Sequence, residues 1–123
     1  MQSSLSTGID IIEIERIKQA VNTWHEAFLN RVFTRGELEL CKGDPSRLAG
    51  RFAAKEAVLK TLSPYMLTCN WKEIEILASA SGRPVLELSG RAVDEFNRKV
   101  IKNMDISISH CRQYAVAVAV SQC

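Results

Sequence analysis

The 123-residue sequence lacks long apolar runs, paired cysteines and any strong excess of charge of one sign. No stretch approaches the ~20 apolar residues of a membrane-spanning helix, and no signal peptide precedes the first strand, so we expect a soluble, cytoplasmic protein. The formal net charge of +2 demands neither nucleic acid nor a membrane as partner. No linker or repeat interrupts the chain, which predicts one domain over residues 1–123.

Several classes of functional site are also missing. The histidines do not cluster and no C-x-x-C pair occurs, which argues against zinc and a disulfide framework and favours reduced thiols; the cysteines are Cys41, Cys69, Cys111 and Cys123. Neither a Walker-type glycine loop nor G-x-G-x-x-G is present. A serine–histidine–acid triad finds no support, because Ser109 and His110 are adjacent in a predicted strand and point to opposite faces.

The most informative stretch that is present runs from Leu48 to Leu62, LAGRFAAKEAVLKTL. At about 100° per residue its leucines and Phe52 share one arc, and small residues cover most of the remaining circumference. This pattern predicts a helix buried on nearly all sides. Glu56 lies among the apolar positions, where a carboxylate is costly unless a cation or metal compensates it. The alternative is an exposed Glu56–Lys60 pair, worth only ~0.3 kcal/mol.

A second acidic residue lies in apolar surroundings near the N-terminus. Residues 8–12, GIDII, predict a short buried strand with Asp10 in its middle, where aspartate is normally depleted. Asp10 could instead bind backbone amides where the strand ends, but two isoleucines follow it. Two carboxylates with a lysine are typical of Mg²⁺ that keeps several waters and takes phosphate oxygens from a substrate. These residues favour phosphoryl-type chemistry on a diphosphate, without naming the substrate.

The remaining pattern predicts an α+β fold, with a largely antiparallel sheet packed against the long central helix. Strands are expected over 71–78, 85–88, 105–110 and 114–120, the last two forming a hairpin. The alanine face of the last strand should pack on a helix or on another subunit. Asp44-Pro45 should begin the central helix and Ser63-Pro64 should end it, with a loop over 65–70.

Two more amphipathic helices and a short capped one complete the prediction. The first is long, with a core stripe of Ile14, Ile17, Val21, Trp24 and Phe28. A capping box formed by Thr34 and Glu37 should open a short helix that ends near 41–43. The last helix covers 89–102 and should turn Val93, Phe96 and Val100 inward.

Taken together, these residues closely resemble the holo-acyl-carrier-protein synthases, the short family of 4′-phosphopantetheinyl transferases. The resemblance rests on G-I-D-I at 8–11, L-A-G-R-F-A-A-K-E-A at 48–57 with Lys60, G-R-P at 82–84 and S-I-S-H at 107–110. It implies the phosphopantetheinyl transferase fold and Mg²⁺-dependent transfer of phosphopantetheine from coenzyme A to a serine of an acyl carrier protein. Adenosine 3′,5′-bisphosphate would be released, in support of fatty acid or polyketide biosynthesis. It also implies a cytoplasmic homotrimer with active sites between subunits.

The resemblance assigns roles to individual residues. It implies that Asp10 and Glu56 bind the metal and that Lys60 contacts the coenzyme A phosphates; further coenzyme A contacts would be Arg51, Arg83, Pro84 and His110. Arg16 matches a carrier-protein contact. Because an acidic partner needs a local basic patch, the neighbouring Lys18, Arg31 and Arg35 are added to that surface. The proton of the attacking serine would pass to a bound water or to a carboxylate.

One departure and two alternatives remain. Where the family often continues into a loop of the type A-L-G-T-G, which should lie near the pantetheine arm, this chain has SPYMLT at 63–68. A non-catalytic module with the same fold would not modify a carrier protein. A Mg²⁺-dependent diphosphate hydrolase would cleave coenzyme A without any acceptor.

Overall fold

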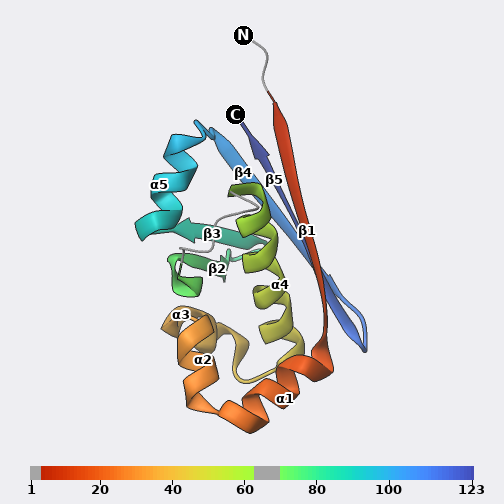
Figure 1. Ribbon diagram of the computed structural model, residues 1–123. Coiled ribbons are helices and arrows are strands. Elements are labelled where there is room, and N and C mark those ends of the chain that lie inside the picture. Colours follow the sequence, from red (N-terminus) through yellow and green to blue (C-terminus); the bar gives the residue numbers. More distant parts are fainter. Residues whose placement is uncertain (1–3, 63–69) are drawn as a thin grey trace.

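A computed structural model, which describes residues 4–62 and 70–123, has a long antiparallel sheet along one side (Figure 1). Its strand order is β1-β5-β4, with β1 spanning Leu5–Glu13, β4 Asn103–His110 and β5 Tyr114–Gln122. Helix α4 (Pro45–Leu62) lies against this sheet. A hairpin of β2 (Ile74–Ala78) and β3 (Pro84–Leu88) and helix α5 (Gly90–Arg98) lie on the other side of α4. This arrangement confirms the predicted α+β fold.

The central strand β5 is tightly packed on one face and open on the other. Its alanines at 115, 117 and 119 are fully buried, while its valines at 116, 118 and 120 are half-buried. The alanine face packs on α4, which decides between the two packings expected from the sequence. Its opposite face carries valines beside the exposed Ile9 and Ile11 of β1, whose side chains are 62% and 64% exposed. The prediction of a buried strand over residues 8–12 is therefore wrong for the face that carries Ile9 and Ile11.

Helix α4 is buried on nearly all sides, as predicted. Asp44 accepts a hydrogen bond from the Ser46 N–H at 3.0 Å, and Pro45 occupies the first helical position. Two glycines allow close approach to the sheet. A Cβ added at Gly8 of β1 would lie 2.1 Å from the Ala57 carbonyl oxygen, and one at Gly50 would lie 2.9 Å from Ile108 Cγ2.

The long first helix predicted from the sequence is two helices. Helix α1 spans Ile14–Trp24 and α2 spans Glu26–Val32, separated by His25 with φ of 49° and ψ of −128°. Ile14 and Ile17 are buried. The break turns Trp24 away from the core, leaving it 64% exposed instead of in the predicted stripe.

The capping box at the next helix is confirmed. Thr34 Oγ1 accepts the Glu37 N–H, and the Glu37 carboxylate accepts the Thr34 N–H at 2.9 Å. Helix α3 then spans Arg35–Cys41 and ends at Lys42, which has left-handed backbone angles.

The smaller sheet and α5 differ from the prediction at their ends. Residues Trp71–Glu73 form a 3₁₀ turn, η1, before β2 begins at Ile74. Helix α5 ends at Arg98, and Val100 has a positive φ of 56° and is exposed rather than turned inward. Ser63-Pro64 and most of the predicted 65–70 loop lie outside the described residues. Within the described part of the chain, no helix is long and apolar enough to cross a membrane.

Candidate active site

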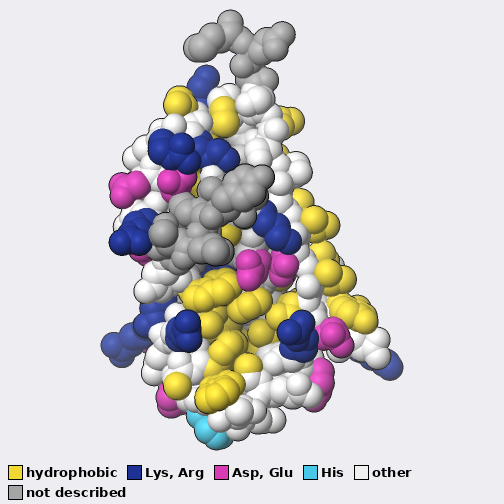
Figure 2. Space-filling view, in the orientation of Figure 1, with side chains coloured by type: hydrophobic (Ala, Val, Ile, Leu, Met, Phe, Trp, Pro, Cys, Tyr) yellow, Lys and Arg dark blue, Asp and Glu magenta, His cyan; other side chains and the backbone are white. Residues whose placement is uncertain are grey.

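Asp10 and Glu56 meet at one cavity, although 46 residues separate them in the sequence. Asp10 lies in the middle of β1 on the face toward α4, paired with Ala117, and Glu56 projects from α4. Both line a cavity of 380 Å³ together with Arg16 from α1 and Phe28 and Phe52. Figure 2 shows acidic side chains near the centre of this face of the molecule, directly above a continuous hydrophobic area.

Lys60 joins the helix to the strand beside these acids. Its ammonium donates a hydrogen bond to the Ile9 carbonyl oxygen at 2.7 Å and lies 3.4 Å from Asp10 Oδ1. Lys60 therefore pairs with Asp10, one turn beyond Glu56, while half of its side chain stays exposed. The alternative of a simple exposed Glu56–Lys60 pair does not describe this arrangement.

The two carboxylates repel each other electrostatically. Burial raises the pKa of Glu56, the negative charge of Asp10 raises it further, and Lys60 opposes both effects. A second positive charge in the cavity would favour the ionised form of Glu56.

The donor set fits a magnesium ion. Two carboxylates facing one cavity, with a raised carboxyl pKa, are hard oxygen ligands that lack a full compensating charge. Among residues 4–62 and 70–123, no group of three or more His, Cys, Asp or Glu side chains is placed to hold a metal. The remaining ligands would therefore be water and substrate oxygens, which is the coordination that Mg²⁺ prefers.

Apart from Lys60, which lies beside the acids, the predicted coenzyme A contacts are not among the described residues that line this cavity. Arg51 lies about 140° around the helix from Glu56, and its Nε donates to the Ile76 carbonyl oxygen of β2 at 3.4 Å. Arg83 and Pro84 line a separate hollow of 410 Å³ beside β4 and β5. There Arg83 lies 3.3 Å from the Asp105 carboxylate, with both side chains largely exposed.

His110 is also remote from the two acids. It ends β4 and pairs with Ala115 of β5, whereas Asp10 pairs with Ala117 from the other side. Two strand spacings and two residues along the strand separate the Cα atoms of His110 and Asp10, about 12 Å. The His110 side chain is exposed.

The predicted basic patch is divided over the surface. Of its residues, Arg16 lines the cavity with the acids. Lys18 lies in a different hollow beside the β4–β5 turn, and Arg31 lines a small one with Trp24. Arg35 pairs with Glu39 at 3.2 Å.

Two features of this part of the molecule were not predicted from the sequence, one in the cavity wall and one in the buried interior. Phe52, assigned to the core, forms part of the cavity wall; its position one turn before Glu56 was the available signal. Lys55 and Glu37 form a fully buried ion pair of 2.7 Å. Burial lowers the pKa of Lys55, and Glu37 opposes that shift.

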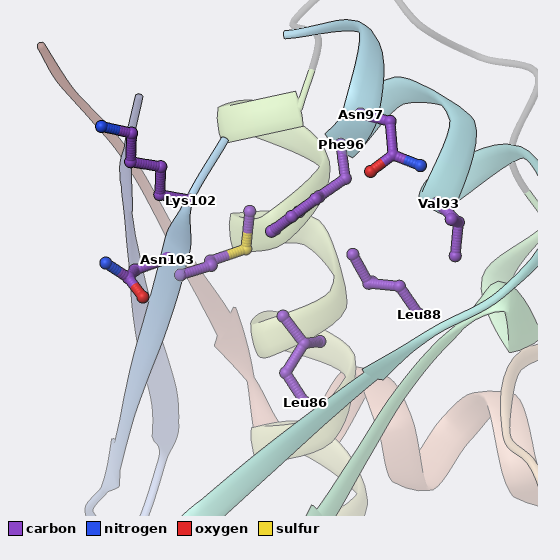
Figure 3. A pocket seen from close by; sticks show the side chains of 8 residues that line it. Leu86, Leu88, Val93, Phe96, Asn97, Lys102 and Asn103 are labelled. Carbon is purple, nitrogen blue, oxygen red and sulfur yellow. The ribbon is translucent and has the colours of Figure 1, made fainter. Parts of the chain in front are cut away.

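A larger hollow of 490 Å³ lies elsewhere, between β3, α5 and the start of β4 (Figure 3). Leu86, Leu88 and Phe96 point into it, whereas Lys102 and Asn103 point away from its centre. It contains none of the candidate residues and no acidic side chain among the described residues that line it. The smaller cavity with Asp10 and Glu56 is therefore the candidate active site.

Comparisons with known proteins agree with the fold. Residues 6–119 match the 4′-phosphopantetheinyl transferase superfamily, and the chain belongs to that family. It is 52% identical to the holo-[acyl-carrier-protein] synthase of Dehalococcoides mccartyi strain CBDB1, over 96% of this chain and 98% of that protein. It is 41% identical to that of Halothermothrix orenii, over 94% of each chain.

Solved structures show the same fold. The holo-[acyl-carrier-protein] synthase of Helicobacter pylori in complex with coenzyme A superposes with a TM-score of 0.85 at 37% identity, covering 94% of this chain and 99% of that one. The Bacillus anthracis enzyme in complex with CoA (3′,5′-ADP) gives 0.75 at 31% identity, covering 94% of both. The chain is thus an enzyme, a phosphopantetheinyl transferase, as the sequence resemblance indicated.

Proposed function

We propose that this enzyme transfers 4′-phosphopantetheine from coenzyme A to a serine of an acyl carrier protein and releases adenosine 3′,5′-bisphosphate. The observation that carries the proposal is the meeting of Asp10 and Glu56 at one cavity, with Lys60 beside them. The relatives' names support the acceptor, and the coenzyme A complexes of two related enzymes support the donor. Such an activity would serve fatty acid or polyketide biosynthesis in the cytoplasm.

Asp10 and Glu56 would hold Mg²⁺, which when bound supplies positive charge against the diphosphate oxygens. Lys60 would place its ammonium on the same phosphates. The serine oxygen would attack the phosphorus that carries pantetheine, its proton would pass to a bound water or to a carboxylate, and the bridging bond to the leaving adenosine 3′,5′-bisphosphate would break. Because phosphoryl transfer needs little covalent chemistry from the protein, positioning and charge neutralisation would be the main contributions of these residues.

The complete site would form between subunits of a homotrimer. Two observations support this. The outer face of the long sheet exposes Leu5, Ile9 and Ile11 beside the β5 valines, an apolar surface suited to a second copy. The Arg83–Pro84 hollow borders that same face, since Val118 and Val120 help to line it. A neighbouring chain would bring its own Arg83, Pro84, Arg51 or His110 toward Asp10 and Glu56.

The acceptor would approach along α1. Arg16 extends from that helix to the acid cavity and would guide an acidic carrier protein toward it. Lys18 and Arg31 lie on neighbouring surfaces and would extend the attraction over a longer range.

The test is the mass of an apo acyl carrier protein incubated with this enzyme, coenzyme A and Mg²⁺. We expect one phosphopantetheine added per carrier molecule and no addition in the presence of EDTA. Coenzyme A cleavage without carrier would instead identify a diphosphate hydrolase. No reaction on any of several carriers would indicate a non-catalytic module.

A further inference from the structure

Lys55 is next to Glu56 in the sequence, but its side chain points away from the acid cavity into the protein. Its ammonium lies 2.7 Å from Glu37 Oε1 and donates to the carbonyl oxygens of Trp71, at 3.1 Å, and Ile74. An ammonium has three N–H donors, and these three contacts use all of them. Lys55 and Glu37 are both completely buried, so Lys55 has no donor left for a substrate phosphate.

Glu37, which forms the ion pair with Lys55, also binds the start of β2. Glu37 accepts the Ile76 N–H at 2.7 Å and the Thr34 N–H at 2.9 Å. Through Lys55 and Glu37, helices α3 and α4 are therefore bonded to Trp71, Ile74 and Ile76 in η1 and β2. Removing one charge would leave the other buried without compensation, which is strongly destabilising.

Trp71, at the start of η1, connects this ion pair to the acid cavity. Its ring stacks on Phe52 with 5.1 Å between centroids and 26° between planes. Phe52 lines the cavity with Glu56 and Arg16. Lys55 binds the Trp71 carbonyl oxygen, so it restrains the backbone of the residue whose indole stacks on the Phe52 ring. Arg16 marks this side as the acceptor side of the proposed site.

We propose that Lys55 is a positioning residue: through Trp71 it fixes the Phe52 wall against which the acceptor protein docks. The inference rests on the proposed transferase function and adds a role for a buried lysine that does not touch the reacting groups. A lysine in contact with phosphate would affect the turnover number, whereas this role affects the KM for the carrier protein.

The test replaces the ion pair by apolar side chains, Glu37→Leu together with Lys55→Met, which avoids leaving one buried charge unpaired. We expect cooperative unfolding to be retained, with kcat and the KM for coenzyme A within about twofold of the parent. The KM for carrier protein should rise about fivefold, as expected for one lost aromatic contact. Lys102→Met is the matched control at an exposed lysine and should change none of these values.

Combining the double substitution with Trp71→Ala tests whether the rise in the KM for carrier protein depends on Trp71. In Trp71→Ala, which should itself raise the carrier KM, the double substitution should cause no further rise. In a Trp24→Phe background, where Trp71 is the sole tryptophan, the double substitution should shift the Trp71 fluorescence to longer wavelength as the stack opens.

Three results would overturn the inference. A hundredfold fall in kcat with unchanged KM would place Lys55 in the chemistry. If the double substitution raises the carrier KM equally in the Trp71→Ala background, Lys55 does not act through Trp71. If the double variant does not fold, a normal carrier KM in both Trp71→Ala and Phe52→Ala would show that the wall does not bind the acceptor. Failure of the proposed function is distinct, because the parent enzyme would then add no mass to the carrier.

Discussion

Replacing Gly8 by alanine should separate the strand and the helix that carry the two acids. The added Cβ would lie 2.1 Å from the Ala57 carbonyl oxygen and 3.0 Å from Lys60 Cβ. Side-chain carbons do not approach an oxygen that closely, so β1 and α4 must move apart by about 1 Å. The obstacle is backbone, which cannot rotate away as a flexible side chain would.

Both stability and activity should fall. Overpacking of this kind costs about 1–3 kcal/mol, offset by up to about 1 kcal/mol because alanine restricts the unfolded chain more than glycine does. We therefore expect a net loss of about 1–2 kcal/mol in the free energy of unfolding. Displacing Asp10 by 1 Å from Glu56 and Lys60 should lower the transfer rate by about a hundredfold.

Gly50→Ala provides the matched control. Among the described residues beyond its own helix backbone, its Cβ would meet the Ile108 side chain, at 2.9 Å, where α4 faces β4. It should therefore destabilise the protein by a similar or smaller amount while keeping most of the transfer activity. Urea unfolding and initial rates at saturating Mg²⁺ measure the two effects. The reasoning is refuted if Gly8→Ala retains full activity, or if both variants lose activity in proportion to stability.

Three further outcomes are expected. Because burial and Asp10 raise the pKa of Glu56 above its ordinary 4.5, the metal-free folded protein loses stability as pH rises through that raised pKa, and Glu56→Gln should remove this loss. Urea unfolding in EDTA should therefore show the variant to be more stable than the parent at neutral pH and equal to it well below pH 4.5, and the transfer assay should show it to be nearly inactive. Light scattering should give a trimer that Ile9→Asp dissociates. Mixing inactive Glu56→Gln with a His110→Ala variant impaired in coenzyme A binding should restore some activity, whereas a fully active monomer would exclude shared sites. Arg16→Glu should raise the KM for carrier protein severalfold and weaken its salt dependence while leaving the KM for coenzyme A nearly unchanged; kinetics identical to the parent at low and high ionic strength would mean that Arg16 contacts no partner.

The sequence predicted the elements whose signals are local. Asp44-Pro45 and the small residues of α4 act within one helix, and the Thr34–Glu37 capping box acts within one turn. The alternating pattern of β4 and β5 likewise reflects burial on one face. In each case the residues that carry the signal are the residues that make the contact, so one sequence is enough.

Other features depend on contacts that no local pattern encodes. The stripe from Ile14 to Phe28 continues in register through His25, so its periodicity gives no sign of the positive φ that divides the helix. The buried Lys55–Glu37 pair joins residues 18 positions apart in different helices. Without knowing that α3 lies against α4, each of them is an ordinary charged residue.

At the candidate active site, too, the residue types could be predicted from local sequence, whereas their spatial relations depend on tertiary contacts. Asp10, Glu56 and Lys60 come together because β1 packs directly on α4 at Gly8. The exposure of Ile9 and Ile11 was not foreseen, since an apolar strand pattern is the same whether the strand is covered by its own chain or by another. The distances from Asp10 to Arg83 and His110 also depend on tertiary structure.

The charges at the acid cavity give an independent reason to expect a shared site. Coenzyme A carries a diphosphate and a separate 3′-phosphate, but Lys60 is already paired with Asp10 and is the lysine beside both acids. Arg16 is the cationic side chain among the described residues that line the cavity, and it reaches the cavity from α1. With Mg²⁺ and Lys60 on the diphosphate, the described residues that line the cavity would offer the 3′-phosphate no cation besides Arg16, which we assign to the carrier protein. In the proposed assembly, Arg51, Arg83 or His110 of a neighbouring copy would supply that cation, so the apolar outer sheet and the incomplete cation set favour the same assembly.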